Sequence, residues 1–221
     1  MHAVDDRDVT NPAFEDYIRG LLGRHDEPVL LEMEREAEET GFPAIGRMAG
    51  VVLELLARSI GANRVFELGS GFGYSGYWFA RAMGDGGELH LTDGDPENER
   101  KAADYLGRAG LGKGVSFHVG DALESFASVD GDFDIVFCDI DKGQYPAAWS
   151  ASRDRIRPGG MYICDNTLRW GSAAIIEERD DRDAPLIAAV RSHNEAIASD
   201  PGFLMTILPI RDGVLVARRS R

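Results

Sequence analysis

From Arg64 onward, short apolar runs alternate with amphipathic segments, and this alternation constrains the fold of the 221-residue chain more than any other feature. Alternation of strand-like and helix-like segments is typical of a parallel, doubly wound sheet in the α/β class. The strand-like runs lie at Arg64–Leu68, Glu88–Thr92, Val115–Val119, Asp134–Cys138 and Gly160–Cys164. The helix-like segments lie near Tyr74–Met83, Glu97–Ala109, Ala122–Phe126, Tyr145–Ile156 and Pro185–Ser199.

The C-terminal end departs from this alternation. Two strand-like runs, Phe203–Ile210 and Val214–Arg218, are joined by Arg211-Asp212-Gly213. An Asp-Gly pair between apolar runs predicts a tight antiparallel hairpin. We therefore predict a Rossmann-like sheet of seven strands, mostly parallel, with helices on both faces. Its ligand crevice is expected at the carboxyl ends of the parallel strands.

The first third of the chain has helical signals instead. Predicted helices run from Pro12 to about Leu22, from Pro28 to Gly41 and from about Ile45 to Ile60. Proline at a first helical position and glycine after a last one support these ends. We predict one domain over residues 1–221, with a helical region at 1–60 and a Rossmann-like core at 61–221.

Composition excludes several classes of protein. The chain has 24 basic and 38 acidic side chains and a net charge of -14, which repels phosphate backbones, so nucleic-acid binding is not expected. No apolar run is long enough to span a membrane, and the polar segment Met1–Thr10 has no signal-peptide core. Cys138 and Cys164 end apolar runs and are expected to be buried and reduced, which favours a cytoplasmic protein.

A glycine-rich turn follows the first strand. Gly71, Gly73 and Gly76 match the dinucleotide pattern GxGxxG, which alone is a weak signal. The first glycine after the strand is Gly69, however, and Glu67 precedes it by two residues. A carboxylate there suits the cationic amino group of S-adenosylmethionine and would repel a pyrophosphate. We therefore favour S-adenosylmethionine, bound by a loop that includes Ser70 and Ser75, over a nicotinamide dinucleotide.

Acidic residues also follow the second and third strands. Asp93, 26 residues after Glu67, suits the ribose hydroxyls of either cofactor. Asp121 and the amide of Ala122 are placed to meet an adenine edge. The alternative is that Asp93 and Asp121 are helix caps after strands.

The fourth and fifth strands end in a second acidic group. Asp139, Asp165 and Asn166 are expected to meet because neighbouring parallel strands end together. Two carboxylates and an amide oxygen suit Mg²⁺, or else Mn²⁺ or Ca²⁺. Beside such an ion, the ammonium of Lys142 would lose its proton more readily and could act as a base. The alternatives are helix-capping or solvated loop acids, and an ion pair of Lys142 with Asp139 or Asp141.

Zinc is not expected, because no histidine lies near another histidine or a cysteine with ligand spacing. Each of the five is more simply a surface or core residue: His2, His25, His90, His118 and His193.

With these residues in hand, the chain resembles the metal-dependent O-methyltransferases of the caffeoyl-CoA and catechol type, over roughly Gly41 to Arg219. The resemblance is carried by four segments: ELGSGFGYS at Glu67–Ser75, CDIDKGQY at Cys138–Tyr145, CDNTLRWGS at Cys164–Ser172 and LPIRDGVLVARR at Leu208–Arg219. It implies that Asp139, Asp165 and Asn166 hold the metal and that Lys142 is the base. It also implies cofactor contacts for these residues: Glu67, Gly69, Ser75, Asp93, Ala122 and Asp139.

The resemblance further implies a homodimer whose N-terminal helices shape the acceptor site. One departure is that Arg169 follows the DNTL segment where caffeoyl-CoA enzymes have Trp, and Trp170 comes next. The N-terminal segment also matches no motif for CoA. Trp170 and Tyr145 could flank an aromatic acceptor or simply pack in the core.

The predicted activity is therefore metal-dependent methyl transfer from S-adenosylmethionine to a hydroxyl of a small catechol-like or other vicinal-diol acceptor. Three alternatives stay open: a metal-independent methyltransferase of the same fold, an NAD-dependent dehydrogenase, and a non-catalytic S-adenosylmethionine-binding protein.

Overall fold

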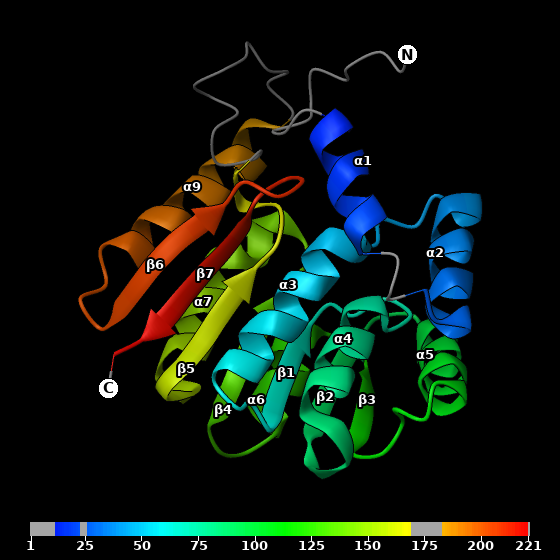
Figure 1. Ribbon diagram of the computed structural model, residues 1–221. Coiled ribbons are helices and arrows are strands. Elements are labelled where there is room, and N and C mark those ends of the chain that lie inside the picture. The colour runs from blue at the N-terminus through cyan, green and yellow to red at the C-terminus, as the bar shows by residue number, and fades with distance from the viewer. Residues whose placement is uncertain (1–11, 23–25, 169–182, 221) are drawn as a thin grey trace.

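The computed structural model describes residues 12–22, 26–168 and 183–220, and these form a seven-stranded sheet with helices on both faces (Figure 1). The strand order is β3-β2-β1-β4-β5-β7-β6. The strands are β1 (Arg64–Leu68), β2 (Glu88–Asp93), β3 (Val115–Val119), β4 (Phe133–Cys138), β5 (Ile156–Cys164), β6 (Phe203–Leu208) and β7 (Val214–Arg219). Strands β1 to β5 pair in parallel, whereas β7 runs antiparallel to β5 and to β6. The predicted fold class is confirmed.

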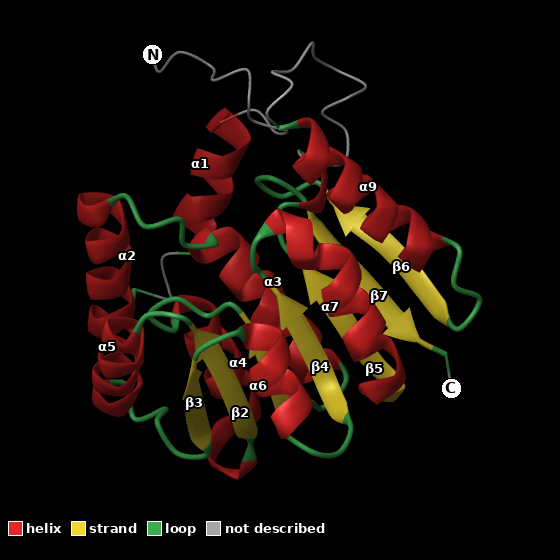
Figure 2. Ribbon diagram, turned by 180° about the vertical axis from the view of Figure 1, so that it is seen from behind, coloured by secondary structure: helices red, strands yellow, loops and turns green. Residues whose placement is uncertain are grey.

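Helices cover the two faces of the sheet in separate groups. Figure 2 shows α6, α7 and α9 in front of the sheet, whereas α3 and α4 cover the opposite face in Figure 1. The helices are α1 (Pro12–Leu21), α2 (Pro28–Thr40), α3 (Gly46–Ser59), α4 (Tyr74–Met83), α5 (Pro96–Arg108), α6 (Ala122–Ser128), α7 (Tyr145–Ser152) and α9 (Ala184–Ala198). Short 3₁₀ turns lie at Gly84–Gly86, Lys142–Gln144 and Arg153–Arg155.

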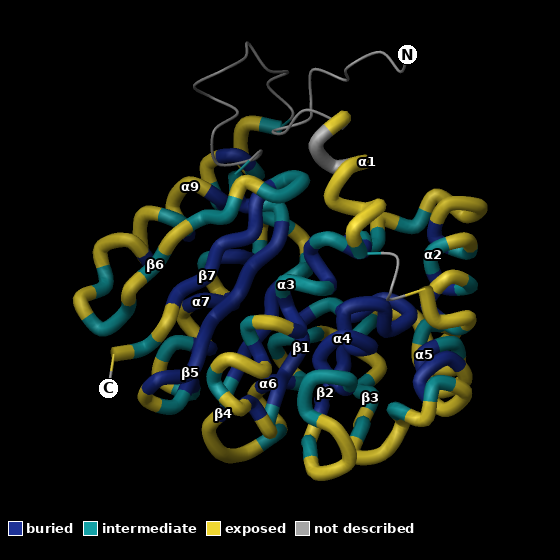
Figure 3. Tube along the Cα trace, viewed as in Figure 1, coloured by how far each residue is buried: buried dark blue, intermediate teal, exposed yellow. Residues whose placement is uncertain are grey.

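The side chains of the strands pack into two cores, one on each face of the sheet, and the central strands contribute to both. One core contains side chains of α2 to α5 and the other those of α6, α7 and α9. Figure 3 shows the central strands and most of α4 as buried, with exposed residues on the outer helices. Burial on both faces explains why β4, with the sequence FDIVFC, reads as a nearly continuous apolar run.

The largest difference from the predicted boundaries is the start of β5. The strand begins at Ile156 rather than Gly160, and α7 ends at Ser152 instead of Ile156. The segment Pro158-Gly159-Gly160 looks like a break in sequence, but a Cβ on Gly160 would lie 2.7 Å from the carbonyl oxygen of Asp134. Glycine therefore lets two strands approach closely, next to a register irregularity, and does not end the strand.

The C-terminal hairpin also differs in detail. Its strands pair antiparallel as predicted, with Leu208 opposite Val214. Residues 209–213 form a longer connection than the tight turn expected from Asp212-Gly213, and both Arg211 and Gly213 have positive φ angles, 50° and 92°.

A partly buried polar network attaches the N-terminal helices to the core. Arg47 of α3 donates hydrogen bonds to both carboxylate oxygens of Glu34 on α2, at 3.0 and 2.6 Å. Tyr74 of α4 donates to the same carboxylate at 2.7 Å. Among the described residues, no helix combines the length and apolar character needed to cross a membrane.

Candidate active site

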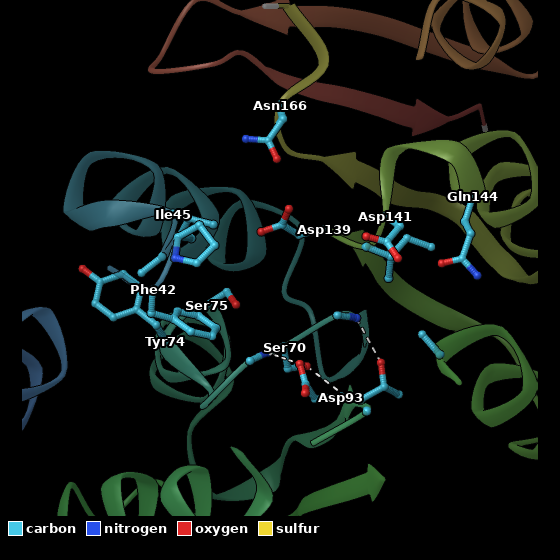
Figure 4. Close-up of a pocket in the computed structure, with 18 of the residues that line it drawn as sticks. Phe42, Ile45, Ser70, Tyr74, Ser75, Asp93, Asp139, Asp141, Gln144 and Asn166 are labelled. Carbon is cyan, nitrogen blue, oxygen red and sulfur yellow. Dashed lines mark hydrogen bonds between the residues drawn. The ribbon is translucent and has the colours of Figure 1, made fainter. Parts of the chain in front are cut away.

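A cavity of about 500 Å³ lies at the carboxyl ends of the parallel strands, where the crevice was predicted (Figure 4). Most of the predicted site residues line it: Gly69, Ser70, Gly71, Ser75, Asp93, Asp121, Ala122, Asp139, Lys142 and Asn166. The other three, Glu67, Gly73 and Asp165, are buried and do not contribute to the lining. The structure thus brings the predicted cofactor loop and the predicted metal ligands to one site.

The glycine turn is held against the end of β2. The backbone amides of Gly69 and Ser70 donate to the hydroxyl and carbonyl oxygens of Thr92, at 3.0 and 2.7 Å. Gly69 has a φ of 82°, and a Cβ there would lie 2.4 Å from the carbonyl oxygen of Asp139, so only glycine fits. Gly76, the last glycine of the GxGxxG pattern, instead packs α4 against Leu91 and does not line the cavity.

Asp93 fixes the shape of this turn while facing the cavity. Its Oδ2 accepts a hydrogen bond from the amide of Gly71 at 3.1 Å. Its Oδ1 accepts from the amide of Asp95 and the side chain of Asn98, both at 2.9 Å. A carboxylate oxygen has two acceptor positions, so Oδ2 keeps one for a ligand.

Asp121 was predicted either to face the cofactor or to cap a helix, and the two positions are compatible. Its Oδ1 caps α6 by accepting hydrogen bonds from the amides of Leu123 and Glu124, at 2.9 Å each. The same residue and Ala122 line the cavity. Helix capping therefore fixes the position of these groups at the cavity wall.

Glu67 lies at the end of β1 and is fully buried. Its Oε1 accepts a hydrogen bond from the hydroxyl of Ser75, whereas its Oε2 has no hydrogen-bond partner among the described residues. Burial raises the pKa of Glu67 to about 8, the bond from Ser75 opposes this rise, and the charge of Asp139 adds to it. The carboxyl group is thus mainly protonated at neutral pH, with Ser75 between it and the cavity.

The two acids after β4 and β5 meet because these strands pair in register, with Cys138 beside Cys164. Burial raises the pKa of both carboxyl groups, that of Asp165 to about 7, and the charge of Asp139 adds to the rise for Asp165. Oδ2 of Asp165 accepts a hydrogen bond from Asn166 at 3.2 Å, but Oδ1 is buried without a partner among the described residues. Figure 4 shows Asn166 and Asp139 extending into the cavity.

Lys142 follows β4 and reaches the same cluster. Its Nζ lies 3.5 Å from Oδ1 of Asp139, so the ion pair considered as an alternative is present. Tyr145 is fully buried and donates a hydrogen bond to the carbonyl oxygen of Asp165 at 2.9 Å. Core packing is therefore the role of Tyr145, and it does not line the cavity. Arg169 and Trp170 lie outside the described residues.

Nothing in the described part of the chain brings three or more His, Cys, Asp or Glu side chains into a metal-binding group. The group at the ends of β4 and β5 has only two carboxylates, those of Asp139 and Asp165, together with the amide of Asn166. Sequence spacing did miss one pair, since His90 and His118 are neighbours on β2 and β3 with their ring nitrogens 3.0 Å apart. Burial, and then the nearby His90, lower the pKa of His118. The pair does not line the cavity.

Several lining residues were not predicted. The loop between α2 and α3 contributes Phe42, Pro43, Ala44 and Ile45, and the β6–β7 connection contributes Arg211 and Asp212. The apolar sequence Phe42–Ile45 after a helix-ending glycine was an available signal for the first group. Nothing local pointed to the second, because its position depends on how the hairpin docks.

A doubly wound sheet with a C-terminal antiparallel pair, and a glycine turn facing strand-end carboxylates, defines a Rossmann-like enzyme of the methyltransferase class. The sequence profile of the O-methyltransferase family matches residues 24–220. The chain therefore belongs to the O-methyltransferase family and is an enzyme of that class, so the dehydrogenase alternative is wrong.

Individual relatives agree with this assignment. A catechol O-methyltransferase from Niastella koreensis is 32% identical over 209 residues, covering 90% of this chain and 92% of the relative. The solved O-methyltransferase TomG from Streptomyces achromogenes, in complex with SAM, is 26% identical with a TM-score of 0.81, covering 93% of this chain and 96% of TomG. An O-methyltransferase from Bacillus cereus, in complex with SAH, is 27% identical with a TM-score of 0.81, covering 94% and 97%.

Proposed function

We propose that this O-methyltransferase uses S-adenosylmethionine and a divalent cation, Mg²⁺ first among the candidates, to methylate a hydroxyl of a catechol-like acceptor. One observation carries the proposal: the oxygen set of Asp139, Asp165 and Asn166 lies beside the glycine turn, with Oδ1 of Asp165 buried and unpartnered among the described residues. The name of the Niastella relative and the ligands of the two solved relatives support it.

The residues of the glycine turn fit S-adenosylmethionine. When bound, this molecule supplies a methyl group on a sulfonium centre. The remaining acceptor position of Asp93 suits a ribose hydroxyl, and Ala122 lies where an adenine edge would meet the backbone. Glu67 would act on the methionine end through Ser75, because that hydroxyl separates the two.

The strand-end oxygens fit a hard divalent cation, whether Mg²⁺, Mn²⁺ or Ca²⁺. Such an ion would satisfy the unpartnered oxygen of Asp165 and offset the repulsion between Asp139 and Asp165, with Asn166 as a third ligand. When bound, it supplies a Lewis acid that lowers the pKa of an acceptor hydroxyl.

The chain's own groups complete the proposed mechanism. As the free amine, Lys142 takes the hydroxyl proton at Nζ, which lies beside the oxygen cluster. Phe42–Ile45 form an apolar wall that keeps water from the reacting atoms. We therefore propose that residues 1–60 serve as an acceptor-site cap on the core at 61–221, within one domain.

The test is transfer of labelled methyl from S-adenosylmethionine to catechol and caffeoyl esters, with Mg²⁺ and with EDTA. We expect EDTA to abolish transfer and Mg²⁺ to restore it. Asp165→Asn should lose most of this activity, whereas Asp130→Asn, an equal charge change on an exposed loop, should keep it.

A metal-independent methyltransferase is the second candidate, and one contact favours it. The ammonium of Lys142 is already paired with Asp139, so a cation of the chain partly neutralises the cluster. Transfer that is equally fast in EDTA and in Mg²⁺ would establish this candidate and refute the first.

We also propose a homodimer in the cytoplasm. Several large apolar side chains are exposed in the monomer and would suit a second copy: Tyr17, Leu21, Leu31, Leu55 and Leu204. Light scattering on the purified protein would give the mass, and a monomeric mass at micromolar concentration would refute the dimer.

A further inference from the structure

Arg211 lies in the connection between β6 and β7, and its loop is fixed against the segment that follows β5. The amide of Thr167 donates to the carbonyl oxygen of Gly213 at 3.0 Å, and the amide of Leu168 donates to that of Asp212 at 3.0 Å. The loop is therefore anchored directly beyond Asn166. Anchoring of this kind sets where Arg211 stands relative to the strand-end oxygens.

The backbone of Arg211 has a φ of 50°, which is uncommon for a residue other than glycine. Its side chain extends past the start of α3, where a Cβ on Gly46 would lie 3.7 Å from Cδ and 4.0 Å from Cζ of Arg211. The arginine side chain thus packs beside the start of α3 at ordinary contact distance. A left-handed residue held by its neighbours at the edge of a cavity suggests a functional role.

The cavity is lined by acidic side chains and by two cationic ones, Lys142 and Arg211. Lys142 is paired with Asp139 at 3.5 Å. Arg211, in contrast, forms no hydrogen bond or ion pair through its side chain with any other residue that the structure describes. Its charge still reaches the cluster, since it lowers the pKa of both Asp139 and Asp165.

A guanidinium group has five N–H donors in a planar fork that matches an anionic group in two-point contact. The rest of the lining would repel an anion, because its acidic side chains are five aspartates: Asp93, Asp121, Asp139, Asp141 and Asp212. If the acceptor were neutral, the guanidinium N–H groups of Arg211 would have only water to bind. Among the described lining residues, Arg211 is therefore the one cationic side chain that has no carboxylate partner and can offer its whole fork to an anion.

We propose that Arg211 binds an anionic substituent of the methyl acceptor, so that the preferred acceptor is a catechol bearing a carboxylate. This inference rests on the proposed function and names the substrate class of the same site. The shared chemistry is an anionic group that presents a pair of oxygens to the guanidinium. A carboxylate and a sulfonate both do this, so the experiment includes each of them.

The experiment compares 3,4-dihydroxybenzoate with its neutral isostere 3,4-dihydroxybenzamide, and adds 3,4-dihydroxybenzenesulfonate. In the wild type, kcat/KM should be higher for the benzoate than for the benzamide. Arg211→Gln should lower this ratio roughly 10- to 100-fold, as expected for a lost charge-assisted hydrogen-bond pair. Arg191→Gln, an equal charge change on the exposed face of α9, should leave the ratio unchanged.

The acceptors separate the possible results. An equal preference for the sulfonate supports recognition of anions in general, whereas a preference for the benzoate alone supports a planar carboxylate. Equal losses for benzoate and benzamide in Arg211→Gln would mean that Arg211 only organises the acidic cluster, and the inference would fall. An unchanged ratio would overturn it as well, while the proposed function would stand.

A second assay separates the anion site from the proposed function. It measures by calorimetry the binding of the same compounds to the protein in the presence of S-adenosylhomocysteine and Mg²⁺. If no acceptor is methylated, the proposed function has failed. Tighter binding of the benzoate than of the benzamide, lost in Arg211→Gln and partly kept in Arg211→Lys, would still support the anion site. Equal binding of both compounds by the wild type would refute it.

Discussion

Glu67→Gln tests the electrostatics of the site most directly, because it changes one buried group and little else. Glu67 is fully buried, with Oε1 bonded to Ser75 and Oε2 unpartnered among the described residues. A glutamine has nearly the same shape, and its amide oxygen can still accept the hydrogen bond from Ser75. It differs in being neutral at every pH.

The size of the effect follows from the pKa of Glu67. Burial raises that pKa from 4.5 to about 8. The unfolded chain therefore loses this proton from about pH 4.5 upward, whereas the folded protein keeps it until about pH 8. The stability that comes from the neutral carboxyl is present below pH 4.5 and is lost as pH rises toward 8. Each pH unit in this window costs the wild type about 1.4 kcal/mol, and at most about 5 kcal/mol in total.

The assay is urea denaturation of both proteins between pH 5 and 8, in EDTA and without S-adenosylmethionine. As the pH rises, the free energy of unfolding of Glu67→Gln should increase relative to that of the wild type by about 1.4 kcal/mol per pH unit. Glu99→Gln, on the exposed side of α5, should show no such trend. A Glu67→Gln difference that is the same at pH 5 and pH 8 would refute the reasoning, because Glu67 would then be ionised in the folded protein.

Two further substitutions probe the neighbouring parts of the site. Lys142→Ala should lower kcat by about 10²- to 10⁴-fold while the Kd of S-adenosylmethionine stays nearly constant, since a base acts on the acceptor proton. A collapse of cofactor affinity would contradict that role. Gly69→Ala should weaken cofactor binding and lower Tm more than Gly110→Ala does, because both have left-handed φ angles, 82° and 72°, but only Gly69 faces a backbone oxygen at 2.4 Å. Equal losses would show that the φ angle alone matters.

Much of the fold could be predicted because its signals are local. Apolar runs, Pro12 and Pro28 at helix starts and the glycine turn at Gly69 each depend on a few adjacent residues. The meeting of Asp139 with Asn166 was also predictable, because parallel strands end on the same edge of a sheet. Predictions failed where a local signal had a distant cause. The fifth strand was predicted to begin at Gly160, but this glycine lies inside β5, where it allows a close approach of the carbonyl of Asp134.

In the site, too, some arrangements depend on contacts between distant segments and could not be predicted from local sequence. His90 and His118 are 28 residues apart, and only the register of β2 on β3 places their rings together. Ser75 stands between Glu67 and the cavity because α4 packs over the end of β1, which no spacing rule describes.

The sequence by itself determined the class of sheet, the glycine turn and the acidic strand ends, because periodicity and turn chemistry act between near neighbours. Only the tertiary structure decided which groups are buried without a partner and which face the cavity. Arg211 is the clearest case, since the docking of Asp212 and Gly213 on Thr167 and Leu168 brings it there. The physical reason is that burial and charge depend on packing between segments far apart in the chain.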